Sequence, residues 1–176
     1  MSTENPEEDL TAVEVTHSPR TVSAVLATLA SILAVFASST SLLAMGLGAF
    51  GLVAVIGGLF VFDSERAMAV GTGIVFVGVV LSGILGSSLA LLVMGSFATI
   101  IAFDIGQNAF SVGRQMSDET ETTRGELVHA SASLAVGIVI VGVAAVVYIA
   151  AFEGLSVSSL AFFLLGAMLL VWVIRQ

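Results

Sequence analysis

The chain has 176 residues, of which 57% are hydrophobic and only 10% charged, and its mean hydropathy of +1.11 leaves too little polar surface to enclose a soluble core. Thirteen acidic residues against five arginines and no lysine give a net charge of −8, which excludes nucleic-acid binding because a negative surface repels the phosphate backbone. The absence of cysteine excludes disulfides, thiolate catalysis and cysteine-ligated metals.

The chain divides into an acidic leader and six apolar stretches. Residues 1–20 contain both prolines, Pro6 and Pro19, and we expect them to form a disordered cytoplasmic tail. A bilayer core is about 30 Å thick, and roughly 20 helical residues cross it. The predicted spans are Thr21–Ser38, Leu42–Phe62, Ala67–Leu85, Ser88–Asp104, Glu126–Phe152 and Val157–Ile174. This pattern predicts an all-α integral membrane protein, with one domain over 21–176 whose six transmembrane helices form three hairpins.

The arginines predict the orientation of these spans. Arg20 precedes the first span, Arg66 lies between the second and third, Arg114 and Arg124 lie between the fourth and fifth, and Arg175 follows the sixth. The alternate breaks carry no arginine. Because arginine-rich loops stay in the cytoplasm, both termini are predicted to be cytoplasmic, which places the protein in the cell membrane as a multi-pass protein.

The longest polar break is the predicted cytoplasmic connection over 105–125. Its first part contains no proline, so we expect the fourth helix to continue past the membrane. Thr123 and Glu126 have the spacing of a capping box, which predicts that the fifth helix starts there. Small residues spaced four apart, such as Ala44 with Gly48 and Ala54 with Gly58, predict close packing between helices.

Polar side chains gather around this connection and form the candidate site. The cluster consists of Asp104, Asn108, Arg114, Arg124, Glu126 and His129. His129 is three residues from Glu126, so the two share a helical face, and histidine is the side chain that titrates near neutral pH. The main interpretation is a hydrogen-bonded polar belt at the membrane surface. A weaker alternative is a metal site of Asp104, Glu126 and His129, which has a single histidine and no paired motif.

The middle of every span lacks Asp, Glu, Arg, His and proline, whereas carriers and pumps usually have an intramembrane ionisable group or a broken helix. No serine has a base near it in sequence, so we expect neither a catalytic residue nor a cofactor. The alternative to a non-enzymatic protein is a small-solute channel or carrier lined by glycine and hydroxyl side chains. The candidate lining residues are Thr72, Ser82, Ser96 and Thr99.

Three segments carry a resemblance to a known family: residues 108–115 (NAFSVGRQ), residues 123–130 (TRGELVHA) and the closing helix that ends in VIRQ. They resemble an uncharacterised haloarchaeal multi-span membrane protein family of unknown function, often encoded near MoxR-type AAA ATPases. A lysine-free, acidic surface is also typical of proteins in multimolar salt, where counter-ions screen self-repulsion. The resemblance implies an AAA ATPase or a membrane protein as partner and carries no catalytic residue.

These observations favour a non-enzymatic membrane subunit or scaffold. We expect it to contact the lipid bilayer along its spans and a partner protein through the cytoplasmic face between Ile105 and His129. The sequence does not determine its oligomeric state.

Overall fold

The computed structural model describes residues 21–115, 123–151 and 156–174, and every regular element in these ranges is an α-helix. The helices are α1 (Thr21–Ala37), α2 (Leu42–Phe60), α3 (Glu65–Ile84), α4 (Leu89–Gln115), α5 (Thr123–Ala151) and α6 (Val157–Ile174). The prediction of an all-helical fold with six helices is therefore confirmed for the described residues. The tail over 1–20 lies outside the described residues.

Four of the helices, α2 to α5, are long and apolar enough to cross a membrane, which is consistent with a membrane protein. Helices α1 and α6 are equally apolar but shorter. Two predictions for the long connection are confirmed: α4 continues beyond Asp104, to Gln115, and α5 begins at Thr123.

Turn chemistry explains why the helices end where they do. Ser64 is the N-cap of α3, and its hydroxyl accepts a hydrogen bond from the amide of Ala67 at 3.2 Å. The preceding residue, Asp63, has a φ of +44°, a left-handed conformation that asparagine and aspartate adopt more readily than most residues. Gly86, with a φ of +99°, supplies the same reversal between α3 and α4.

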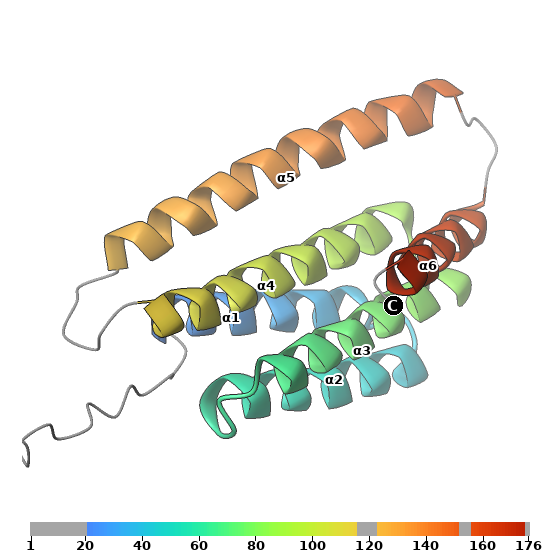
Figure 1. Cartoon of the computed structure of the whole chain (residues 1–176). Coiled ribbons are helices and arrows are strands. Elements are labelled where there is room, and N and C mark those ends of the chain that lie inside the picture. The colour runs from blue at the N-terminus through green and yellow to red at the C-terminus, as the bar shows by residue number, and fades with distance from the viewer. Residues whose placement is uncertain (1–20, 116–122, 152–155, 175–176) are drawn as a thin grey trace, which may run out of the picture.

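Helices α1 to α4 form the core of the bundle, in which α2 packs on α3, α3 on α4 and α1 on α4 (Figure 1). The α2–α3 pair is held at backbone contact by glycine. A Cβ atom on Gly71 would lie 2.6 Å from the amide nitrogen of Val55, and one on Gly51 would lie 2.7 Å from the carbonyl oxygen of Gly71. In lipid, where helix association depends on close packing, such contacts fix the pair in place. Gly58 also meets α3, as its small-residue spacing predicted.

Helices α5 and α6 are peripheral. None of the residues in the apolar, membrane-length stretch of α5 is buried. In the corresponding stretches of α2, α3 and α4, 33–50% of the residues are buried. Figure 1 shows α5 above α4 with its second half apart from the rest of the bundle. Gly137, near the middle of α5, is in contact range of the Phe97 ring of α4.

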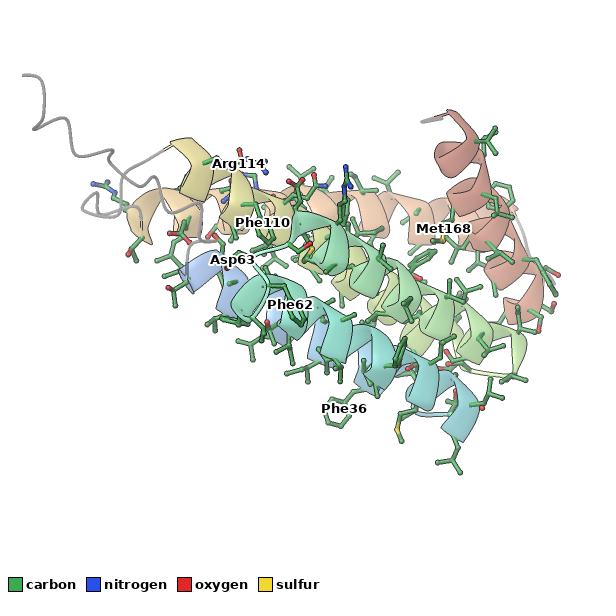
Figure 2. The ribbon with its side chains drawn as sticks, turned by 60° about the horizontal axis from the view of Figure 1, so that its bottom comes forward. Phe36, Phe62, Asp63, Phe110, Arg114 and Met168 are labelled. Carbon is green, nitrogen blue, oxygen red and sulfur yellow. The ribbon has the colours of Figure 1, made fainter. Side chains whose placement is uncertain are left out.

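Helix α6 does not complete a third hairpin along α5. It packs on α3 and to a lesser extent on α4, and it runs across the bundle in both views (Figures 1 and 2). Ala161 is fully buried in the cluster that contains Leu92, and Ser158 at its first turn donates to the carbonyl of Ile84 at 3.5 Å.

Candidate functional site

The polar side chains of the sequence cluster gather at one end of the bundle, where α1, α3 and α5 begin and α4 ends (Figure 1). We call this the polar end. It comprises Ser23, Glu65, Asp104, Asn108, Arg114, Arg124, Glu126, His129 and Ser133. Figure 2 shows Arg114 at this end, one helical turn beyond Phe110 of the core.

The first connection at the polar end joins α5 to α1. Glu126 is only 3% exposed, and its Oε2 accepts hydrogen bonds from both the backbone amide and the hydroxyl of Ser23, each at 2.7 Å. Ser23 lies in the first turn of α1, where backbone amides have no partner within the helix and the helix dipole is positive. The carboxylate of one helix thus caps the N-terminus of another.

The second connection joins α5 to α4 through Asp104. Its Oδ2 accepts a hydrogen bond from the hydroxyl of Ser133 at 2.5 Å and lies 3.2 Å from Nε2 of His129. The His129 contact has the distance of an ion pair but not the angle of a hydrogen bond, and Nε2 itself is buried without a hydrogen-bond partner. Both side chains are otherwise about half exposed. The charge of His129 therefore decides how strong this contact is.

The third connection joins α4 to α3. Nη1 of Arg114 lies 2.5 Å from Oε2 of Glu65, and both side chains are exposed. Arg114 occupies the last turn of α4 and Glu65 the first turn of α3. Each charge is therefore opposite in sign to the partial charge of its helix end, which is a favourable interaction. An exposed pair of this kind contributes little to stability, on the order of 0–1 kcal/mol.

The two remaining residues of the predicted cluster take no part in these connections. Asn108 is half-buried on α4, one turn beyond Asp104, and no hydrogen bond joins it to the other described cluster residues. Arg124 is exposed at the start of α5 and has no ion pair within the described ranges. It borders a shallow depression of about 510 Å³ whose described lining is Thr123, Arg124, Leu127, Val128 and Ser131.

The predicted metal ligands do not come together. In the described part of the chain, no three His, Asp or Glu side chains are close enough to hold a metal ion. Asp104 and His129 are adjacent, whereas the Glu126 carboxylate is directed to the N-terminus of α1. The chemistry that the described residues of the polar end support is hydrogen bonding and ion pairing.

The hydroxyl side chains considered as a channel lining are buried in the bundle. Those of Thr72, Ser82 and Thr99 donate to carbonyl oxygens three or four residues earlier in their own helices, at 2.7–2.9 Å. Ser96 is buried with no hydrogen-bond partner for its hydroxyl. Three of the four hydroxyls are therefore engaged by their own backbone.

Sequence reasoning missed three partners at the polar end: Ser23, Glu65 and Ser133. Ser133 was recognisable only as a small residue on α5, and it lies one turn after His129. Ser23 and Glu65 are far from their partners in sequence, and neither belongs to a motif that would indicate such a partner.

Comparison with known proteins gives a family but no function. No curated protein and no solved structure matches this chain. The model of a family described as of unknown function (DUF7519) matches residues 17–171, which include all six helices except the last residues of α6. The chain belongs to this family.

Proposed function

We propose that the protein is a non-enzymatic integral membrane subunit or scaffold that presents the first part of α5 to a partner protein. The observation that carries this proposal is the contrast within α5. Its start is anchored to α1 and α4 by Glu126, Ser133 and His129, whereas none of the residues in its apolar, membrane-length stretch is buried. A helix that is anchored near its start and leaves most of its apolar side chains exposed is suited to contact another molecule.

Within this proposal, all six helices cross the cell membrane and the polar end faces the cytoplasm, as the positions of the arginines favour. The native chain has no cysteine, so single cysteines report topology without background. Thr123→Cys, at the polar end, should react only with a membrane-permeant reagent. Thr40→Cys, in the turn at the other end, should react with an impermeant one. Labelling of both positions from the same side would refute the six-span arrangement.

The partner surface that we propose is the face of α5 around Arg124. Two of the residues named from the sequence are less suitable as contact residues, because Glu126 is buried and Arg114 is paired with Glu65. Arg124 is exposed beside Leu127 and Val128, which are also exposed. An exposed cation next to apolar side chains matches a partner with a carboxylate beside an apolar patch. The family resemblance suggests an AAA ATPase or its membrane partner as the candidate.

The test is co-purification in high salt after mild extraction, with companions identified by mass spectrometry. A stoichiometric companion should be recovered with the native chain and lost with Arg124→Glu. Arg66→Glu is the matched control, since Arg66 is also exposed in the first turn of a helix at the polar end and should retain the companion. Recovery of the protein alone, or equal loss with both variants, would refute the proposed surface.

The alternative, a small-solute channel, has less support because three of its four hydroxyls are bonded to their own helices. Solute flux into liposomes that disappears with Ser96→Leu would favour it over the scaffold.

A further inference from the structure

The contact between Asp104, His129 and Ser133 has a property that anchoring alone does not require. Its ionisable members sit on different helices, with Asp104 on α4 and His129 on α5. Histidine is the side chain that changes charge between pH 5 and 8. We propose that this cluster is a proton-dependent clamp, which holds α5 against α4 when His129 is protonated and loosens when it is neutral.

The geometry gives the two charge states different contacts. Protonated histidine has an N–H on both ring nitrogens, so Nε2, 3.2 Å from Oδ2 of Asp104, becomes a charged donor. A small ring rotation then gives a charge-assisted hydrogen bond, roughly twice as strong as a neutral one. In the neutral tautomer with its proton on Nδ1, the lone pair of Nε2 faces the carboxylate, and Ser133 is then the described residue that donates to Asp104.

Among the described residues, the contact within ion-pair distance of His129 is the one to Asp104. The helices that pack against α5 are α4 and α1. Helix α1 contains no ionisable residue, and α4 contains only Asp104 and Arg114. Arg114 is paired with Glu65, and on α5 itself Glu126 is bonded to Ser23 while Arg124 lies exposed at the helix start. The charge of His129 thus acts on the α4–α5 contact through Asp104.

Loosening the clamp affects α5 because little else holds its second half. Beyond Gly137 the described side chains of α5 are half-buried or exposed, with Ile138, Val139 and Val143 all more than half exposed. A Cβ added at Gly142 would meet no atom within 4 Å. A change at the polar end is therefore passed along a rigid helix to a segment with few packing restraints.

Distance measurement between two spin labels in lipid nanodiscs tests the clamp. Met94→Cys on α4 and Val143→Cys on α5 are exposed positions, and the absence of native cysteine keeps the labelling specific. Between pH 5 and pH 8 the distances between the labels should shift to longer and broader values. His129→Gln should remove this shift, and His129→Arg should hold the short distances at both pH values.

Two further variants assign the effect to its residues. Asp104→Asn should remove the pH shift, whereas Glu126→Gln should keep it because the glutamine can still accept the hydrogen bonds from Ser23 of α1. Identical distances at both pH values in the native background would overturn the proposal. So would a shift that persists in His129→Gln or disappears in Glu126→Gln. The readout needs no partner protein, so its failure leaves the proposed function standing.

Discussion

Replacing Glu126 is the perturbation whose effect the structure defines best. The variant Glu126→Ala removes the acceptor of two hydrogen bonds and leaves the amide and hydroxyl of Ser23 unpaired in a buried position. A hydrogen bond to an ionised group contributes about 1.5–3 kcal/mol, so the two together represent roughly 3–6 kcal/mol. The native state also bears the cost of keeping the carboxylate out of water, which the variant recovers in part. We therefore expect the free energy of unfolding to fall by about 2–4 kcal/mol.

The measurement is reversible unfolding in mixed micelles, followed by helicity. Ser23→Ala removes only one of the two donors to the carboxylate and should cost about 1.5–3 kcal/mol. Because both variants act on the same contact, the double variant should cost less than the sum of the single effects. Glu65→Ala is the matched control, an exposed carboxylate at the same end, and should cost less than about 1 kcal/mol. A loss below about 0.5 kcal/mol for Glu126→Ala, or additive effects with Ser23→Ala, would refute the capping argument.

Three further predictions follow from the packing. Gly71→Ala should destabilise the bundle by about 1–3 kcal/mol or more in the same unfolding assay, because the added Cβ would overlap the backbone of α2. Gly46→Ala is the control: its added Cβ meets no atom within 4 Å, so it should be neutral or slightly stabilising. Arg114→Ala should change the unfolding free energy by less than about 1 kcal/mol, and high salt should reduce even this effect, since the pair with Glu65 is exposed. Ser96→Ala should leave the unfolding free energy unchanged or raise it by up to about 1 kcal/mol, because it removes a buried hydroxyl without a partner. A measured loss of more than about 1 kcal/mol would indicate a hydrogen bond that the structure does not contain.

The sequence predicted that the helices form and which residues gather at the polar end. It did not predict which of these residues bond to one another. The lack of proline after Asp104 predicted that α4 continues beyond it, and the spacing of Thr123 with Glu126 located the start of α5. These are local signals, each contained within a few residues. The bond from Ser23 to Glu126 joins positions 103 residues apart, and it depends on α1 lying beside α5. One sequence contains no signal for such a pairing.

The prediction of three hairpins failed to anticipate the direction of α6 for a related reason. At 1.5 Å per residue, the 18 residues of α6 extend about 27 Å, close to the thickness of a hydrocarbon core, so length and apolar composition favoured a span parallel to the others. Its apolar residues occur on every side, so composition cannot select the face that packs. The selection comes from small residues in contact: a Cβ on Gly83 would lie 3.0 Å from that of Ala161. Hydropathy indicates that α6 belongs in an apolar medium, whereas the contact between Ala161 and α3 determines the angle at which it lies.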